Sequence, residues 1–445
     1  MTATDALGHP LTGASRAAAT LYDTALRQFQ CYRDDPVATI DQALADSPAF
    51  VMGHVLRAWL HLLGTEPSGV PVAREALAAA RSQPVNEREA GHLKAIGQLA
   101  DGQWHAAART LEDVSVAHPH DALALQAGHL LDFCVGDSRM LRDRIARALP
   151  AWARSMPGYH TLLGMHAFGL EETGLYARAE AAGRQAIELE RHDAWAWHAV
   201  AHVMEMQDRV EDGVAWLTSD TAAWSENNFF AVHNWWHLAL HHLERGESER
   251  VLALFDGPIF GEGRTLALDL VDASALLWRL ELAGADVGPR WTRVAEAWAP
   301  FADEAHYTFN DVHAGMAFAR AGRTDLLEGL RETQARAQGQ RGDNAGFTAQ
   351  VGAPLLESLV AFAQGHEGRA IDGLRQVRPI AHRFGGSHAQ RDLIDWTLVE
   401  AAVRAGDAAL ARALSAEREQ LKPTRRSVVR LAQRAQALAP QALAA

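Results

Sequence analysis

Residues that several large protein classes require are scarce in this sequence. Two cysteines, Cys31 and Cys134, cannot supply the disulfide framework of a small secreted domain, and neither lies in a CxxC or Cys/His spacing typical of a zinc site. Only Lys94 and Lys422 among the 42 basic residues are lysines, so a lysine Schiff base or a phosphate-loop lysine has almost no candidate. The motifs of dinucleotide, P-loop, zinc-protease and α/β-hydrolase sites are also missing, so no nucleotide or flavin is expected.

Positive charge and long apolar runs are scarce too. The 42 basic residues stand against 55 acidic ones, a formal net charge of −13, which argues against nucleic acid as a partner because a phosphate backbone would be repelled. The first residues lack the basic start and apolar core of a signal peptide, and no run resembles a membrane span of about 20 apolar residues. We therefore expect a protein without membrane segments in the reducing cytoplasm.

What the sequence does contain is a regular series of turns. Apolar residues make up 48% and charged residues 22% of the chain, which is typical of a folded protein. Short turns built around Gly or Asp interrupt the apolar segments at intervals of 34 to 43 residues. They lie at Gly64, Gly102, Gly136, Gly174, Asp208, Gly246, Gly284, Gly322, Gly365 and Gly406.

The segments between these turns have a helical pattern. Apolar residues recur every three or four positions, and each turn joins two such segments into a hairpin. A single hairpin cannot bury its own apolar face, so neighbouring hairpins must stack. The interval is close to that of tetratricopeptide (TPR) repeats. The sequence therefore predicts an all-α fold, a right-handed α-solenoid of about ten TPR-like helix hairpins; another class of paired-helix repeat stays open.

We expect one continuous domain along the whole chain. Residues 1–47 and 423–445 are rich in alanine and less periodic, so we predict an N-terminal and a C-terminal helical cap there. Residues 48–422 form the TPR-like α-solenoid between the two caps.

The 22 histidines are unusually placed. In a TPR-like fold the first helix of each hairpin lines the inner surface, and seven of these helices carry a histidine seven to ten residues before the turn. They are His54, His92, His129, His166, His198, His237 and His313. We expect their imidazoles to lie near one height on the inner face.

Two of these helices carry a row of polar residues. In WAWHAVAHVMEMQ, His198, His202 and Glu205 share one helix face, and in VHNWWHLALHHLE, His233 and His237 do the same. We predict these five as catalytic residues, with histidine as general acid or base. His198, His202 and His237 are the predicted ligands of one divalent metal ion, the one cofactor that the sequence suggests.

A structural role is the alternative for each histidine. Pairs spaced by four occur on many helices where each imidazole bonds a backbone carbonyl or a neighbouring acid. Repetition in register favours a functional role, because leucine or alanine would fill a packed face without polar nitrogens that need partners.

Aromatic and polar side chains in the same segments are predicted to bind the substrate, since aromatic rings beside a few polar groups are typical of small-molecule pockets. Alternatives stay open: tryptophan can wedge between hairpins, Asn310 or Asp311 can cap a helix, and Arg391 can pair with Asp392. The predicted substrate-binding residues are Trp197, Trp235, Asp269, Asp272, Asn310, Asp311, His313 and Arg391.

Four blocks, GMHAFGLEETGLYARAE, DAWAWHAVAHVMEMQ, HNWWHLALHHLE and LDLVDASALLWRLEL, resemble in order and spacing the family of tetratricopeptide repeat protein 38. An early block, DDPVATIDQALADSPAFVMGH, agrees as well. The resemblance implies the repeat fold and a ligand pocket, without naming a reaction. It adds His166, Glu172 and Asn234 to the predicted substrate-binding residues and gives Glu171 as a further recurrent polar position.

Two functions follow from these patterns. The first is an enzyme that holds a small organic molecule in a His/Trp-rich internal pocket and uses histidine acid/base or metal-assisted hydrolytic or lyase chemistry. The second is a non-catalytic TPR scaffold that binds a peptide or protein partner in its concave groove. The near absence of lysine favours the first, because peptide-carboxylate clamps are usually built from Lys, Arg and Asn. A homodimer is compatible with either.

Overall fold

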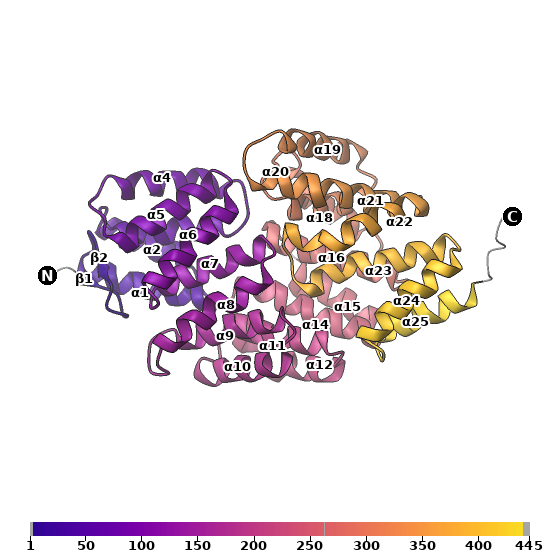
Figure 1. Cartoon of the computed structure of the whole chain (residues 1–445), viewed down its shortest axis with the longest axis horizontal. Helices are drawn as coiled ribbons and strands as arrows, with labels where there is room; N and C mark the ends of the chain where they lie inside the picture. Colours follow the sequence, from indigo (N-terminus) through magenta and orange to yellow (C-terminus); the bar gives the residue numbers. More distant parts are fainter. Residues whose placement is uncertain (1–2, 262, 439–445) are drawn as a thin grey trace. The chain divides into compact units, whose positions relative to one another are not determined.

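The computed structural model describes residues 3–261 and 263–438. The fold is all-α, built from helices that follow one another as hairpins, as the sequence predicts (Figure 1). Near the N-terminus, β1 (Ala3–Thr4) and β2 (Pro10–Leu11) form a short antiparallel ribbon in which Ala3 pairs with Leu11.

The predicted turns each separate two helices of a hairpin. Up to the fifth predicted turn, the hairpins are α3 (Val51–Leu62) with α4 (Gly69–Arg81), α5 (Glu87–Ala100) with α6 (Trp104–Ala117), α7 (Ala122–Cys134) with α8 (Ser138–Ala148), α9 (Tyr159–Glu171) with α10 (Tyr176–Leu189), and α11 (Ala194–Met206) with α12 (Val210–Ser219). After it they are α14 (Ala231–Arg245) with α15 (Ser248–Leu254), α16 (Ala267–Leu282) with α17 (Arg290–Trp298), α18 (Thr308–Arg320) with α19 (Thr324–Gln338), α21 (Ala353–Ala363) with α22 (Glu367–Val377), and α23 (His388–Arg404) with α24 (Ala408–Leu421).

The backbone conformation explains why Gly or Asp stands at these turns. From Gly102 onward every predicted turn residue has a positive φ, including Asp208 at 58°. Glycine adopts this left-handed conformation without a steric penalty, and aspartate is among the residues that tolerate it best. At the first turn the positive φ of 58° belongs to Thr65, one residue after the predicted Gly64.

Other helices complete the chain. Within the predicted N-terminal cap, α1 (Arg16–Cys31) and α2 (Pro36–Asp46) form a further hairpin. The remaining α-helices are α13 (Thr221–Ser225), α20 (Asp343–Phe347) and α25 (Arg426–Ala437). Short 3-10 or π-helical turns are η1 (Leu149–Ala151), η2 (Phe255–Ile259), η3 (Ala299–Phe301), η4 (Thr348–Gly352) and η5 (Arg378–Phe384).

The described chain groups into two compact units. The first contains the residues up to Val203 together with Asp220–Asn234 and Arg341–Asp343. The second contains Met204–Ser219, Trp235–Gln340 and the residues from Asn344 onward.

Each unit has its own buried aromatic core. Trp59, Trp104 and Trp224 are fully buried in the first unit, and Trp236 and Trp298 in the second. Trp278 of α16 is almost fully buried as well, and its indole Nε1 donates to the Thr397 hydroxyl of α23 over 3.0 Å. Packing between helices is thus the role that the structure gives Trp278. Both cysteines are buried and free.

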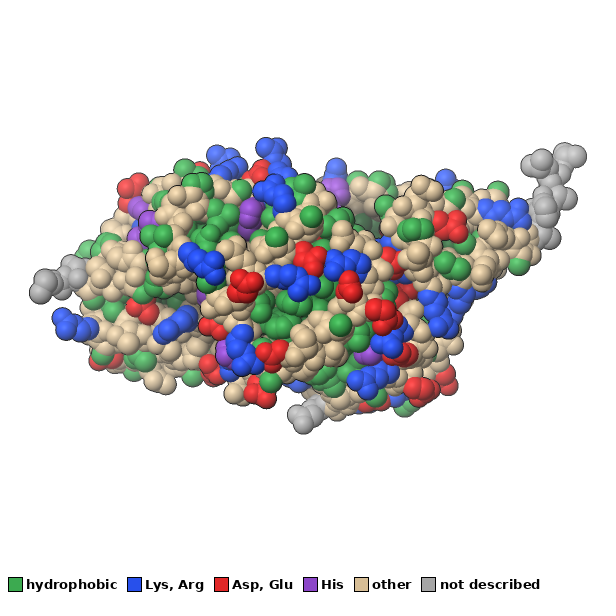
Figure 2. Space-filling model, turned by 90° about the horizontal axis from the view of Figure 1, so that it is seen from below, with side chains coloured by type: hydrophobic (Ala, Val, Ile, Leu, Met, Phe, Trp, Pro, Cys, Tyr) green, Lys and Arg blue, Asp and Glu red, His purple; other side chains and the backbone are tan. Residues whose placement is uncertain are grey.

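Two properties bear on the surroundings of the protein. Acidic and basic side chains are interspersed on the face that Figure 2 draws, as on an ordinary solvated surface. Within the described residues, one helical stretch, Asp343–Ala363, is long and apolar enough to cross a membrane by length and composition, with a mean hydropathy of 1.2. Because 61% of its apolar 18-residue window is buried, a core helix accounts for it equally well, and a single such stretch is weak evidence for a membrane span.

Candidate histidine metal site

Three histidines of the first unit lie together. His198 and His202 are one turn apart on α11, and His233 lies in the first turn of α14. The Nε2 atoms of His198 and His233 are 3.1 Å apart, a hydrogen-bond distance. One ring nitrogen from each of the three lies within 4.8 Å of those from the other two. This cluster, His198, His202 and His233, could hold a metal ion, because imidazole nitrogens are common ligands of first-row metals.

Burial favours the neutral form of His198. Burial lowers the pKa of His198 well below its ordinary value, and the neighbouring His202 and His233 rings lower it further. In the bond between His198 and His233, one ring donates its N–H and the other accepts. A neutral imidazole is also the form that binds a metal.

Aromatic rings enclose the cluster. Phe168 of α9 lies with its ring centroid 5.3 Å from that of His198 and 5.2 Å from that of His202. Trp195 lies 4.9 Å and Phe230 5.2 Å from the His198 ring centroid. His198 and His202 are buried, whereas His233 and Phe230 are half-buried, so the cluster has one side closer to solvent.

Tyr32 belongs to this aromatic wall although nothing in the sequence pattern suggested it. Its ring stacks on Trp195 with centroids 5.7 Å apart, and it also contacts Phe230 at 4.9 Å. Tyr32 ends α1 in a left-handed conformation, with φ of 56°. Its carbonyl accepts a hydrogen bond from the Phe229 amide, which joins the end of α1 to the segment before α14.

A carboxylate lies behind the cluster. The Oε2 atom of Glu171, at the end of α9, is 3.5 Å from Nδ1 of His202, and both side chains are buried. A carboxylate on the far ring nitrogen of a metal-binding histidine orients the ring and raises its basicity. Only the family resemblance pointed to Glu171 as a candidate residue. The pattern of one helix does not show which acid a histidine on the next helix will contact.

The other first-unit residues predicted to bind substrate have local partners. The Trp197 indole donates to the Arg191 carbonyl over 2.8 Å, and the Asn234 amide donates to the Ala194 carbonyl over 3.2 Å. The Ser138 hydroxyl donates to Glu172 over 3.3 Å. His166 is half-buried, and burial together with Arg178 and Arg142 lowers its pKa to about 4.

Three other histidines of the predicted register have contacts of their own outside this cluster. The His54 ring bonds the Pro48 carbonyl over 2.9 Å. His92 accepts a hydrogen bond from the Trp59 indole at Nδ1 over 3.1 Å, so its Nε2–H donates to Asp121 over 2.9 Å. His129 lies edge-on to Trp195, with centroids 5.7 Å apart, and burial and Arg144 lower its pKa to about 3.

Glu205 of α11 lies in a charged network of the second unit. Its Oε1 is 2.6 Å from the Arg425 guanidinium and 3.4 Å from the Lys422 ammonium, and Arg425 also pairs with Glu244 at 2.9 Å. Burial alone would raise the pKa of Glu205, but Arg425 and Lys422 outweigh it and hold the pKa below its ordinary value. Glu205 is therefore a buried anion with cationic partners, which is the environment of a structural ion pair.

The remaining predicted site residues also lie in the second unit. His237 follows His233 by one turn of α14, and Trp235 is half-buried. Asp269 and Asp272 are buried on α16, and Asn310 and Asp311 are buried on α18. His313 bonds the Phe309 carbonyl over 2.8 Å, and Arg391 donates to the carbonyls of Gly385 and Gly386. The catalytic and binding roles assigned from the sequence stay predictions.

Comparison with known proteins adds little to this site. No protein-family model matches the chain. A chain in the structure of Naa15/Naa10 bound to HypK-THB is similar, with 12% sequence identity over 94% of this chain and 66% of that chain, and a TM-score of 0.26. The protein spans just under two thirds of that chain's length. The present protein is a helical repeat protein. Its membership of the tetratricopeptide repeat protein 38 family, which it resembles in sequence, stays a prediction.

Proposed function

We propose that the cluster of His198, His202 and His233 binds a divalent first-row metal ion and that the site acts on a small organic molecule by hydrolytic or lyase chemistry. The observation that carries this proposal is the convergence of three imidazoles from two helices within 4.8 Å, with one of them backed by Glu171. Rigid helices that converge in this way hold ligands in fixed directions, as a metal site requires.

The ligand set favours zinc. Imidazole nitrogens suit Zn²⁺, which takes four ligands and in catalytic sites keeps one position for water or substrate. The carboxylate of Glu171 contacts the ligand His202 through its Nδ1, which leaves Nε2 for the ion. A bound divalent cation supplies positive charge that makes water easier to deprotonate at neutral pH.

The residues around the ligands favour a small substrate. Phe168, Trp195 and Phe230 offer apolar ring faces, while His233 is the half-buried member of the cluster. An apolar wall with few polar groups excludes water and orients an organic molecule. We propose that His233 lies on the side from which such a molecule approaches.

Metal titration tests the proposal. Protein made without a histidine tag and treated with a chelator is titrated with Zn²⁺ by calorimetry and with Co²⁺ by visible absorption. We expect one ion per chain, and His198→Ala or His202→Ala should weaken binding at least about 100-fold, equal to about 2.7 kcal/mol. Absence of stoichiometric binding, or equal binding by these variants, would overturn the proposal.

The matched control is His54→Ala, the same change at a histidine of the register whose ring bonds the Pro48 carbonyl. It should leave metal affinity unchanged. Circular dichroism of each variant separates a lost ligand from a lost fold. The same titration on His237→Ala tests its predicted role as a ligand.

A further inference from the structure

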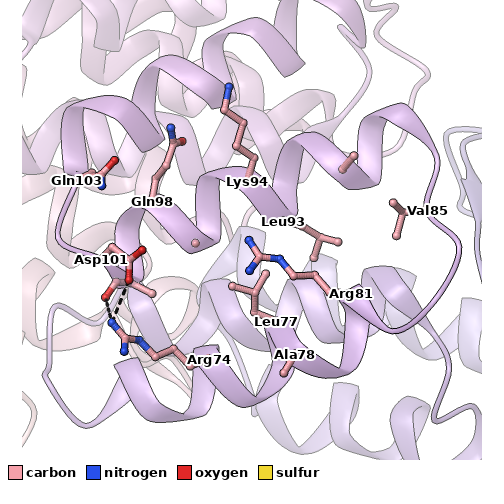
Figure 3. Close-up of a pocket in the computed structure, with 13 residues that line it drawn as sticks. Arg74, Leu77, Ala78, Arg81, Val85, Leu93, Lys94, Gln98, Asp101 and Gln103 are labelled. Carbon is pink, nitrogen blue, oxygen red and sulfur yellow. Dashed lines mark hydrogen bonds and ion pairs between the residues drawn. The ribbon is translucent and has the colours of Figure 1, made fainter.

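A surface groove lies between α4 and α5 of the first unit. Its lining residues are far from the histidine cluster in the sequence. It has a volume of about 690 Å³, and Figure 3 shows the side chains that line it. From α4 come Arg74, Leu77, Ala78 and Arg81, and from α5 come Ala90, Leu93, Lys94, Gly97, Gln98 and Ala100. Val85, Asp101 and Gln103 complete the lining.

Helical spacing places these residues on two facing sides. The α4 residues are spaced by three and four, as on one face of a helix, and so are Ala90, Leu93, Lys94 and Gly97 of α5. Leu77 and Leu93 supply apolar groups to the floor of the groove. Figure 3 shows the Arg81 guanidinium beside them, between the two helices, and the Lys94 side chain extending from α5 away from Arg81. Lys94 is two positions from His92 along α5, so the groove lies on the side of the helix away from the buried imidazole.

The basic side chains of the groove are not neutralised. Asp101 is the acid among the described lining residues, and the Arg74 guanidinium already pairs with it at 3.0 Å. Arg81 and Lys94 are exposed and make no hydrogen bond or ion pair with any residue that the structure describes. Arg81 reaches toward α5, because a Cβ on Gly97 would lie 2.9 Å from its guanidinium. In a chain with a net charge of −13, two free cations over an apolar floor are a local reversal of charge.

We propose that this groove binds a short extended peptide segment of a partner protein, with acidic side chains for Arg81 and Lys94 and apolar side chains for the floor. Charge complementarity selects carboxylates. Length selects a peptide over a small anion: from Ala90 to Ala100, α5 runs for about 15 Å at about 1.5 Å per residue. That length fits about five extended residues at about 3.3 Å each, far more than one phosphate or carboxylate needs.

The test uses a fluorescein-labelled peptide that alternates leucine and glutamate, with fluorescence anisotropy on the full chain. We expect saturable binding that weakens about tenfold or more in Arg81→Glu/Lys94→Glu, because both cations become repulsive. A matching peptide with glutamine for glutamate should bind about as weakly to the unaltered chain. The matched control, Arg16→Glu/Arg154→Glu, makes the same charge change at two exposed arginines of the first unit and should leave binding unchanged.

A second variant fills the groove without altering its charge. Gly97→Leu places a side chain on the floor against the flexible end of Arg81, and a leucine favours the helix over a glycine. It should also abolish peptide binding. Equal binding by Arg81→Glu/Lys94→Glu, equal loss in the control, or full competition by inorganic phosphate at matched ionic strength would each overturn the proposal.

Discussion

His92 and His198 stand at the same distance from the turns of their hairpins and have opposite surroundings. Each lies ten residues before its turn residue, Gly102 or Asp208. The His92 ring is held between the Trp59 indole and the Asp121 carboxylate, with both nitrogens bonded. The His198 ring instead faces another imidazole, that of His233, and lies among aromatic rings.

The difference shows that register alone does not assign a role. A repeat sets the height of a side chain on its helix, and neighbouring hairpins decide whether it meets a partner. An imidazole whose two nitrogens are bonded to a tryptophan and an aspartate has no nitrogen left for a metal ion or a substrate. An imidazole that lies among other imidazoles can bind a metal ion together with them. The structural alternative therefore fits His92, and the functional one fits His198.

Buried aspartates repeat this contrast. Asp121 lies 2.9 Å from His92 and 3.2 Å from Arg88, and these partners hold its pKa below the ordinary value although burial alone would raise it. Asp311, on α18 of the second unit, is equally buried, and burial raises its pKa to about 7, with Gln334 as the opposing hydrogen-bond partner. One carboxylate is stabilised as an anion and the other as the neutral acid.

The largest expected effect is that of Asp311→Asn, which sharpens the contrast between the aspartates. Below about pH 4 both folded and unfolded Asp311 carry a proton. Between about pH 4 and pH 7 the unfolded chain releases its proton while the folded chain keeps it, so Asp311 makes the protein less stable as the pH rises. Asparagine removes this dependence and should raise the free energy of unfolding by about 4 kcal/mol at pH 7.

Urea unfolding of both proteins from pH 4 to pH 7 measures this effect. The gain from Asp311→Asn should be small at pH 4 and grow toward neutral pH. Asp372→Asn, the same change at an exposed carboxylate on α22, should give a difference that stays flat with pH. A flat difference for Asp311→Asn as well would contradict the assigned protonation of Asp311.

The next effect tests the contrast between the histidines directly. His92→Ala leaves the Trp59 N–H unbonded, removes a partner of Asp121 and opens a cavity, so we expect the free energy of unfolding to fall by about 3 kcal/mol. His233→Ala, in metal-free protein, should cost less than about 1 kcal/mol because His233 is half-buried. Denaturant unfolding in the presence of a chelator compares the two. Similar losses would mean that both rings are structural.

How much of the molecule was predictable depends on how far apart the partners lie in the sequence. The turns at Gly102 and Asp208 follow from local conformational preference, and the shared face of His198 and His202 follows from helical spacing. The partners of His92 come from other hairpins, 33 residues before it and 29 after it, so one helix pattern does not reveal them.

Tyr32 is the extreme case of such distance. It reaches Trp195 because the end of α1 bonds the backbone of the segment before α14. A left-handed tyrosine at a helix end leaves no periodic signal, and the backbone bond that places it depends on chain pairing across the unit. The aromatic wall could therefore be predicted only in part, from the residues beside the histidines.

The smallest expected effect concerns the carboxylate next to His202. It tests whether Glu171 supports a metal-binding histidine or only holds the ring in place, as Asp121 holds His92. Glu171→Gln keeps the shape of the side chain and removes its charge beside Nδ1 of His202, so we expect Zn²⁺ affinity to fall about tenfold with one ion still bound per chain. The control is Glu190→Gln, which removes a carboxylate 2.9 Å from Nδ1 of His192 and should leave Zn²⁺ affinity unchanged. If Glu171→Gln instead changed the stoichiometry, Glu171 would itself be a ligand. If it changed neither quantity but lowered the free energy of unfolding, Glu171 would play for His202 the structural part that Asp121 plays for His92.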